Sequence, residues 1–324
     1  MGSISDIEEP INCNKSIDNN IITKNEEAID RLRLQFSNIL SGEYIPDELR
    51  SYYIESGNIK EIRKKIWKNG ESTVTATSYY KNGNIESKIT RKNKKLNGKT
   101  VIYYENGNIK AKQIYKDGKL DGLHIKYYNN GAISSKVNFK NGKKNGLAIF
   151  YDLNGKVKKE EIWESGKESG LWKEYNESGK IVAKAKFKDG KKNGIFTNYF
   201  SNGNIKIKMN FLNDKIHGKR YEYYDNGKIE TEISYVNGVK EGLTTAYYLN
   251  GITKRIVNFK DGKATGLVKE YYNNGKIKSE ANFEDNKQHG ITIFYNVDGS
   301  IRSKQKFKND KFKNYIKKWY KLGN

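Results

Sequence analysis

The sequence contains one cysteine and two prolines among 324 residues. Cys13 has no second thiol to pair with, so an intramolecular disulfide is excluded, which fits a reducing compartment. Pro10 and Pro46 both precede residue 57, so the rest of the chain lacks the residue that sheets tolerate least.

Long apolar runs and targeting signals are also missing. No stretch of about 18 consecutive apolar residues occurs, so no membrane span is expected. The start, MGSISDIEEP, lacks the basic and apolar blocks of a signal peptide. We therefore expect a cytoplasmic protein. Only 35% of the residues are hydrophobic, which favours a thin, extended architecture over one thick core.

Residues that carry catalysis are scarce. The three histidines are His124, His217 and His289, and the last two directly precede glycines as turn residues. A single cysteine excludes a thiolate zinc cluster, and no isolated pair of carboxylates stands out. The segment NGKKNG (141–146) has the wrong glycine spacing for a phosphate-binding loop. We predict no enzymatic activity, no cofactor and no metal site.

The charge is large and uneven. Residues 1–56 contain 5 Lys/Arg and 11 Asp/Glu, a net charge of −6, and the remaining residues contain 56 and 27, a net charge of +29. A basic surface attracts nucleic acid, anionic lipid or an acidic protein. Only 8 of the 61 basic residues are arginine, although arginine is favoured for phosphate recognition. The alternative is that the lysines reflect an A/T-rich genome.

What the sequence has in abundance is repetition. The glycine that follows a repeated tyrosine, in most copies one of a pair of aromatic residues, recurs every 24 residues, at Gly83, Gly107, Gly131, Gly155, Gly179, Gly203, Gly227, Gly251, Gly275 and Gly299. The first aromatic of each pair is a tyrosine, from Tyr79 to Tyr295. Self-similarity at a fixed period indicates a repeat array.

Each repeat predicts one β-hairpin. Asn-Gly and Asp-Gly between alternating segments are strong hairpin signals, and Asp214, Asn286 and Asp310 replace the turn glycine with residues that also tolerate positive φ. We expect an all-β repeat array, an elongated, twisted antiparallel meander of hairpins. Alternation predicts one apolar face and one polar face, with His124 and Lys126 on the polar one. The expected apolar set in one repeat is Leu123, Ile125, Tyr127, Ile133, Val137 and Phe139.

The ends of the chain differ from the array. Residues 1–22 are acidic and polar, which predicts disorder. Residues 23–56 contain an amphipathic pattern in NEEAIDRLRLQFSNILSG, which predicts a short helical cap on the first strand. The predicted organisation is therefore 1–22, a helical cap at 23–56, and the array at 57–324.

The segment YKDGKLDGLHIKYYNNGAI (115–133) resembles the MORN repeat variant found in bacterial proteins, and the resemblance extends over about residues 57–324. It implies a ribbon of β-hairpins without catalytic residues. Members of this family are associated with antitoxins, so the resemblance also implies a cytoplasmic protein that binds and blocks a partner.

Two candidate binding features lie on the face expected to be polar. The first is an apolar patch in the middle of the array, typical of a protein interface, formed by Phe150, Ile162, Trp172, Phe196 and Phe200. The alternative is that the helix or a neighbouring chain packs there. The second is a basic stripe, interrupted by Glu160, Glu232, Ile256 and Glu280, formed by Lys88, Lys112, Lys136, Lys184 and Lys208. The alternative for the lysines is a solvated face.

Two functions follow. The first is a non-enzymatic inhibitor of a toxin or defence protein, whether an antitoxin, an immunity protein or a phage-borne anti-defence protein. The second is a basic sheet that binds RNA or an anionic membrane directly. A third idea is that the acidic N-terminal segment competes with the partner for the basic array. No feature of the sequence assigns a homo-oligomer.

Overall fold

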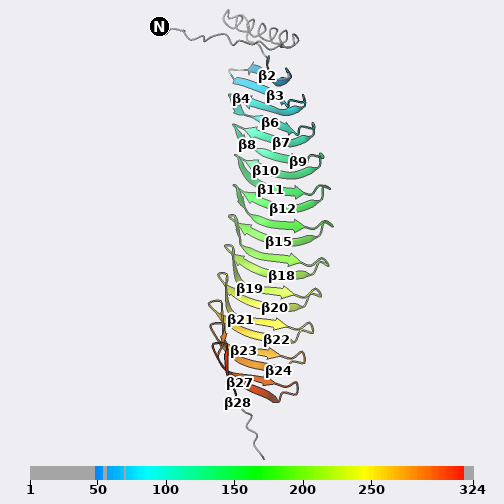
Figure 1. Cartoon of the computed structure of the whole chain (residues 1–324). Helices are drawn as coiled ribbons and strands as arrows, with labels where there is room; N and C mark the ends of the chain where they lie inside the picture. Colours follow the sequence, from blue (N-terminus) through cyan, green and yellow to red (C-terminus); the bar gives the residue numbers. More distant parts are fainter. Residues whose placement is uncertain (1–47, 54–56, 69–70, 317–324) are drawn as a thin grey trace, which may run out of the picture. The chain divides into compact units, whose positions relative to one another are not determined.

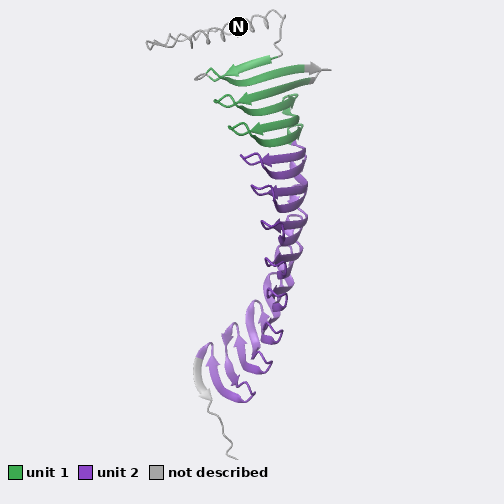
Figure 2. Cartoon of the chain, turned by 90° about the vertical axis from the view of Figure 1, so that its right-hand side faces the viewer, with its two compact units in different colours: residues 1–119 green, residues 120–324 purple. Residues whose placement is uncertain are grey.

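The computed structural model describes residues 48–53, 57–68 and 71–316 (Figure 1). In these parts of the chain there are 28 β-strands and no helix, and so no helix that could span a membrane. The chain divides into two compact units, residues 1–119 and 120–324 (Figure 2). The all-β repeat architecture predicted from the sequence is confirmed.

The first unit is built from antiparallel strands joined in sequence order. They are β1 (Glu48–Tyr52), β2 (Ile59–Lys68), β3 (Glu71–Tyr79), β4 (Ile85–Lys92), β5 (Lys95–Leu96), β6 (Gly98–Tyr103) and β7 (Ile109–Lys116). The short strand β8 (Lys119–Leu120) contains the boundary between the units.

The second unit continues the same pattern. Its strands are β9 (Gly122–Tyr127), β10 (Ile133–Lys140), β11 (Lys143–Tyr151), β12 (Val157–Glu164), β13 (Lys167–Glu168), β14 (Gly170–Tyr175), β15 (Ile181–Lys188), β16 (Lys191–Lys192), β17 (Gly194–Tyr199), β18 (Ile205–Leu212), β19 (Lys215–Tyr223), β20 (Ile229–Val236), β21 (Val239–Tyr247), β22 (Thr253–Lys260), β23 (Lys263–Tyr271), β24 (Ile277–Glu284), β25 (Lys287–Gln288), β26 (Gly290–Tyr295), β27 (Ile301–Lys308) and β28 (Lys311–Ile316). Within each unit successive hairpins lie side by side in a single layer (Figure 1).

The N-terminal prediction is partly wrong. Residues 48–52 belong to the segment 23–56 that was expected to be helical, but they form β1, which pairs antiparallel with β2. The array therefore begins before residue 57. The remainder of the predicted cap, residues 23–47, and the predicted disordered segment 1–22 lie outside the described residues.

The Asn-Gly and Asp-Gly pairs make the hairpin turns that the sequence predicts. Asn141 and Gly142 both have positive φ, 51° and 80°, as a two-residue type I′ turn requires. Asp214 replaces the turn glycine and has φ 67°, so the predicted tolerance of this residue type is confirmed. The amide of Gly142 also donates to the carbonyl of Leu120, 2.7 Å away, in the preceding repeat.

A β-bulge in each repeat changes which residues share a face. In the hairpin of β9 and β10, Ile133 lies opposite Tyr127 and Ser135 lies opposite Lys126, so Ser134 is an extra residue. Beyond this bulge Val137 lies opposite His124. Because directly opposed residues point to the same side, the predicted grouping of Val137 with Leu123 is wrong.

We name the two sides of the sheet from this register. Face A carries His124, Val137, Phe139 and their equivalents in other repeats, and face B carries Leu123, Lys136 and their equivalents. Face A was expected to be polar at His124 and its equivalents. Instead it holds the most buried residues of the described chain, including Ala148 (0% exposed), Thr292 (1%) and Val268 (3%).

The core on face A is thin and made of small side chains. Thr292 is the largest fully buried side chain among the described residues. Half-buried aromatic rings flank the small residues, and the rings of Phe196 and Phe211 make an edge-to-face contact with centroids 6.2 Å apart. Such a core buries little apolar area per repeat, so inter-repeat hydrogen bonds carry a large share of the stability.

Candidate functional site

Where the second residue of the pair is a tyrosine, its hydroxyl links one repeat to the next. The hydroxyl of Tyr224 donates to the carbonyl of Tyr247, 2.7 Å away and 23 residues further along the chain. The same bond, at 2.7 or 2.8 Å, is made by Tyr53, Tyr80, Tyr128, Tyr248 and Tyr272. In several repeats a lysine stands over this ring, as Lys254 does over Tyr248 at 5.7 Å.

The tips of the loops are linked in the same way. The side-chain amide of Asn82 donates to the carbonyl of Glu105, and Asn202 and Asn250 bond equivalent carbonyls 23 residues further on. The repeated tyrosine and asparagine are therefore structural residues that connect neighbouring hairpins. The sequence shows that the tyrosine and the asparagine each recur at one position of the repeat, but only the register of the folded repeats reveals their hydrogen-bond partners.

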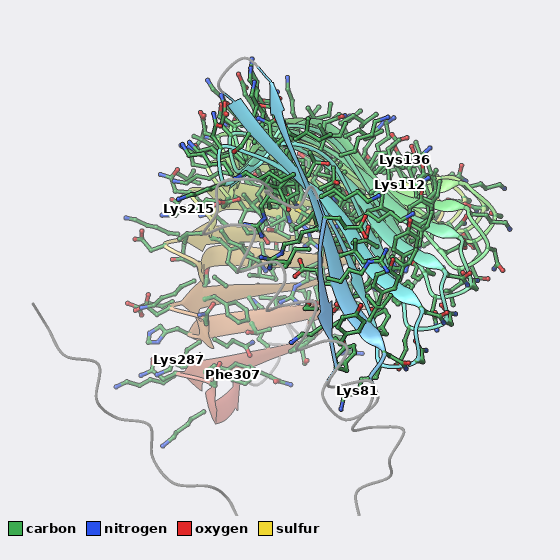
Figure 3. All side chains as sticks on the ribbon, turned by 90° about the horizontal axis from the view of Figure 1, so that it is seen from above. Lys81, Lys112, Lys136, Lys215, Lys287 and Phe307 are labelled. Atoms are coloured by element: carbon green, nitrogen blue, oxygen red, sulfur yellow. The ribbon has the colours of Figure 1, made fainter. Side chains whose placement is uncertain are left out.

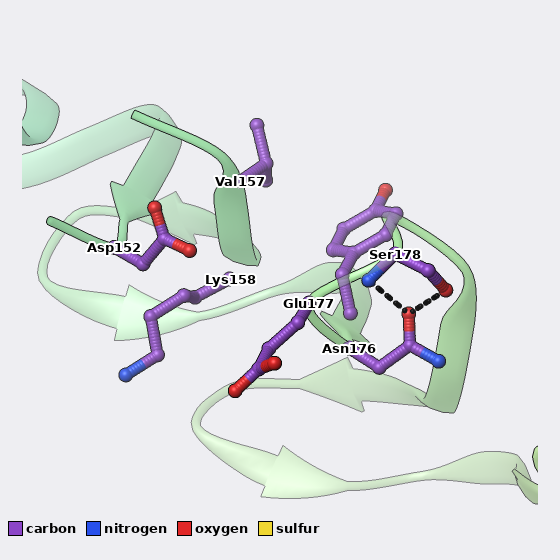
Figure 4. Close-up of a pocket in the computed structure, with 7 residues that line it drawn as sticks. Asp152, Val157, Lys158, Asn176, Glu177 and Ser178 are labelled. Carbon is purple, nitrogen blue, oxygen red and sulfur yellow. Dashed lines mark hydrogen bonds between the residues drawn. The ribbon is translucent and has the colours of Figure 1, made fainter. Parts of the chain in front are cut away.

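Three repeats have no aromatic residue at the linking position, which holds Asp152, Asn176 and Asn296 instead. A pocket of about 590 Å³ opens between the first two, lined by Asp152, Val157, Lys158 and residues 175–178. We name this pocket the tyrosine socket. Figure 4 shows Asp152 and Lys158 on one side of it and Asn176 and Ser178 on the other. Its volume is within the range of ligand sites in proteins.

The sequence-predicted apolar patch is not a single surface. Trp172 lies opposite Ala185, which is 1% exposed, so Trp172 is on face A, and the register of Phe196 and Phe150 places them on the same face. Ile162 lies opposite Leu147, on face B, and is 40% exposed.

Phe200 belongs neither to the face A group nor to the face B position of Ile162. It occupies the position of the linking tyrosine, at the start of a loop. The prediction that the five residues share one face is wrong, because the bulges alter the alternation between strands. The role of these residues in binding a partner stays a prediction.

The sequence-predicted basic residues share face B. Lys136 lies opposite both Ile125 and Ile149, and its ammonium group is 5.7 Å from the ring of Tyr151. Lys184 and Lys208 both lie opposite Thr197. In the first unit Lys88 and Lys112 both lie opposite Val101. Their function as a binding stripe stays a prediction.

The acidic residues that interrupt this stripe are paired within the sheet. Lys173 lies opposite Glu160 and forms an ion pair with it at 2.9 Å, and Lys269 pairs with Glu280 at 3.1 Å. Glu232 is paired with Lys219. The breaks in the stripe are therefore locally neutral, and do not place uncompensated negative charge on face B.

A second row of lysines was missed by the sequence analysis. These residues directly follow the type I′ turn, and the row in the second unit consists of Lys143, Lys167, Lys191, Lys215, Lys263, Lys287 and Lys311. Lys215 and Lys287 point outward at one margin of this unit (Figure 3). The signal in the sequence was a lysine directly after the turn glycine, as Lys143 follows Gly142. Lysine recurs more regularly at this position than in the basic stripe that the sequence analysis chose.

The sequence analysis also missed a row of exposed aliphatic residues on face B. In the second unit this aliphatic row is Leu123, Leu147, Leu171, Ile195, Leu243, Leu267 and Ile291. Their exposed fractions lie between 38% and 56%. Lys219 occupies the one equivalent position between Ile195 and Leu243. Of this row, Leu123 had been assigned to the same face as Val137, and the bulge places the two residues on opposite faces.

The repeat geometry agrees with a known family. The model of the MORN repeat variant matches nine segments that together make up more than half of the chain, namely 73–93, 96–117, 120–141, 144–164, 168–189, 192–213, 216–237, 240–261 and 264–285. The chain belongs to the MORN repeat variant family. MORN repeats indicate a repeat scaffold that binds partners.

Similar solved structures add little to this assignment. The crystal structure of TcdB2-TccC3-TEV has 11% identity and a TM-score of 0.18, with 81% of this chain and 17% of that chain covered. The present chain thus spans about one sixth of that protein. A porin-like protein from Bacteroides uniformis ATCC 8492 has 9% identity and a TM-score of 0.18, with 79% and 95% covered. TM-scores this low establish neither fold nor function. No curated protein matches the chain.

Within this MORN array, face A contains a buried acidic residue. Glu161 is 5% exposed and accepts a hydrogen bond from Trp163 Nε1 at 2.9 Å, and its other oxygen pairs with Lys159 at 2.6 Å. Burial, and then the charge of Glu161, raise the pKa of Glu168. Among the described residues no cluster of three or more His, Cys, Asp or Glu could hold a metal ion.

His124 is the buried histidine of face A. It is 8% exposed and packs against Phe139 with ring centroids 5.7 Å apart. Burial, and then the charge of Lys126, lower its pKa below the ordinary 6.5, so the imidazole is neutral at pH 7. It is therefore a core residue of the repeat and not a residue of the polar face, as the sequence analysis expected.

A basic hollow lies on the first unit of the array. It has a volume of about 340 Å³ and is lined by Arg63, Lys65, Arg91 and Lys94 beside the apolar Val74. Glu61 pairs with Arg63 at 2.8 Å. Two of the eight arginines of the chain gather here, which the sequence analysis did not predict.

Proposed function

We propose that the protein is a non-enzymatic inhibitor that binds and blocks a protein effector in the cytoplasm. The effector would be a toxin or a nuclease-type defence protein, and the inhibitor an antitoxin, an immunity protein or an anti-defence protein. The observation that carries the proposal is the aliphatic row on face B.

The aliphatic row has the properties of a protein interface. Exposed aliphatic residues are common singly, but these seven recur at one position of the repeat and lie on one face. Strands lie about 4.8 Å apart, so successive members of the row are separated by roughly 10 Å. Ile162 adds apolar surface between Leu147 and Leu171. The stripe lysines beside the row supply a polar rim for an acidic partner surface.

A second candidate function is binding of RNA or of an anionic membrane. The basic hollow of the first unit favours it, because arginine and lysine around an apolar floor can bind a phosphate group. The two functions differ in salt dependence. Phosphate binding weakens steeply as salt rises, whereas contacts through aliphatic side chains do not.

Affinity capture tests the proposal. The tagged full chain is incubated with host lysate and nuclease at about 0.3 M salt, which reduces the Debye length to a few ångström. A Leu147→Ser/Leu171→Ser variant is compared with Leu153→Ser, because Leu153 is 61% exposed at a loop tip, away from the row. We expect one stoichiometric protein with the parent and the control, and its loss with the double variant.

The captured protein must also be inhibited by the purified chain at an equimolar ratio. Equal capture by all three chains would contradict the role of the aliphatic row. Recovery of nucleic acid or lipid alone, at low salt and without nuclease, would replace the proposal by the second function.

A further inference from the structure

The tyrosine socket is the place that an aromatic ring fills in other repeats. In the repeats of Tyr128 and Tyr224 the hydroxyl reaches a carbonyl 23 residues further along, and position 152 plus that separation leads to Tyr175, which lines the socket. The ring and the hydroxyl are missing from the chain itself at Asp152. The pocket therefore has the location and the surroundings of a tyrosine side chain.

The cation that accompanies the ring is still present. In the repeats of Phe200 and Tyr248 the lysine six residues later stands 5.6 and 5.7 Å from the ring centroid. Lys158 is the equivalent residue of the socket. In the part of the chain that the structure describes, its ammonium group has neither an ion pair nor a hydrogen bond. An aromatic guest would supply the cation–π partner that Lys158 lacks.

The socket stays open because the loops keep their form without tyrosine. The amide of Asp152 donates to the carbonyl of Lys156 at 2.9 Å, the same bond that the amide of Tyr128 makes to Ala132 at 2.8 Å. Asp152 Oδ1 accepts from the amides of Asn154 and Lys156 at 2.9 and 2.8 Å. The carboxylate thus holds the loop from within, and the neighbouring backbone does not move in to fill the pocket.

We propose that the tyrosine socket binds a 4-hydroxyphenyl group, the side chain of a tyrosine exposed on a partner protein. Its hydroxyl donates to the carbonyl of Tyr175, its ring lies against Lys158, and Val157 contributes apolar contact. The inference rests on the proposed function in one respect, namely that the 4-hydroxyphenyl group belongs to a partner protein. The carboxylates of Asp152 and Glu177 favour a neutral phenol over an aromatic acid or a phosphotyrosine.

The socket at Asp152 is more complete than the one expected at Asn176. The residue six positions after Asn176 is Val182, so no cation is provided there. Asn176 Oδ1 accepts from both the amide and the hydroxyl of Ser178, at 3.0 and 2.7 Å, which keeps this side chain within its own loop (Figure 4). The guest site is therefore assigned to Asp152 and Lys158.

Binding of the probe N-acetyl-tyrosinamide to the full chain is measured by ligand-observed NMR titration. We expect saturable binding at one site, and binding at least threefold weaker for N-acetyl-phenylalaninamide, because it lacks the hydrogen bond to the Tyr175 carbonyl. Asp152→Tyr fills the socket from within and should weaken probe binding at least tenfold. Asp225→Tyr adds a tyrosine at a loop position outside the socket and should leave binding unchanged.

A second variant tests the assignment by gain of binding. Tyr248→Asp removes a ring that lies against Lys254 and bonds the carbonyl of Tyr271, so it opens a second socket. The number of probe sites should rise from one to two. Unsaturable binding to the parent, or equal binding to the parent and Asp152→Tyr, would overturn the proposal.

The source of the ring is tested with the captured effector. Asp152→Tyr should weaken its capture at least tenfold, and Asp225→Tyr should not. If Asp152→Tyr abolishes probe binding but leaves capture unchanged, the assignment to a partner's tyrosine is overturned, and a small phenolic molecule is the ligand. Failure of capture by every chain counts against the proposed function, whereas the probe titration is independent of it.

Discussion

The tyrosine hydroxyls that connect the repeats predict a local change in stability. Tyr224→Phe removes the hydrogen bond to the Tyr247 carbonyl and leaves the ring in place. The hydroxyl is part-buried, and burial, followed by the charge of Glu230, raises its pKa. A hydrogen bond of this kind contributes about 0.5–1.5 kcal/mol. Local opening should therefore become about two- to tenfold more frequent, since about 1.4 kcal/mol corresponds to a factor of ten.

Native-state hydrogen exchange measured by mass spectrometry is suited to this prediction. Each repeat contacts only its neighbours, so the faster exchange should be confined to peptides from β20, β21 and β22. Phe200→Tyr is the reverse change, because a hydroxyl added there would reach the Tyr223 carbonyl, and it should slow exchange by a similar factor. If both variants exchange like the parent, or if Tyr224→Phe accelerates the whole second unit uniformly, the hydroxyl is not the link between repeats.

Three further predictions concern face A, the turns and pH. Ala148→Leu should lower the free energy of unfolding by about 1–3 kcal/mol in urea denaturation, because the side chain has no room; an unchanged midpoint would contradict the burial. Gly170→Ala and Gly266→Ala, with φ +75° and +76°, should each cost about 1–2 kcal/mol; Gly170→Ala should cost more, since only its Cβ would meet Ile162, 3.2 Å away, and equal losses would refute this. Glu168→Gln should raise the melting temperature at pH 7 but not near pH 4: a raised pKa means that the folded state binds the proton more tightly, so the native carboxyl loses stability as pH rises above 4.5.

The period and the turns of the fold could be predicted from the sequence, because their signals are local. Asn141-Gly142 specifies a turn within two residues, and the spacing of Gly131 and Gly155 reports the repeat directly. The placement of side chains on the two faces could not be predicted in the same way. Alternation holds along one strand, but the extra residue Ser134 shifts everything after it, so Val137 and Phe139 were assigned to the wrong partners.

The candidate site depended on the same difficulty. Ile162 was chosen as an exposed apolar residue and is exposed, but Trp172, chosen with it, belongs to face A. The tyrosine socket is visible in the sequence as Asp152, one of three non-aromatic residues, with Asn176 and Asn296, in a column of aromatic residues. Its meaning required the hydrogen bonds of the complete repeats, such as that of Tyr128, which show what the missing ring would do. A substitution becomes a site only when the contacts it removes are known.

The constant separation of donor and acceptor has a consequence for how such a gene can change in length. The hydroxyl of Tyr128 and the amide of Asn82 each reach a carbonyl 23 residues further on, although they belong to different repeats. A deletion or duplication of one full 24-residue period, starting at any point within the array, rejoins the chain in the same register. Every remaining donor then meets an equivalent acceptor. Any shorter change separates them, so inheritance should vary the number of repeats in whole periods while each hairpin keeps its length.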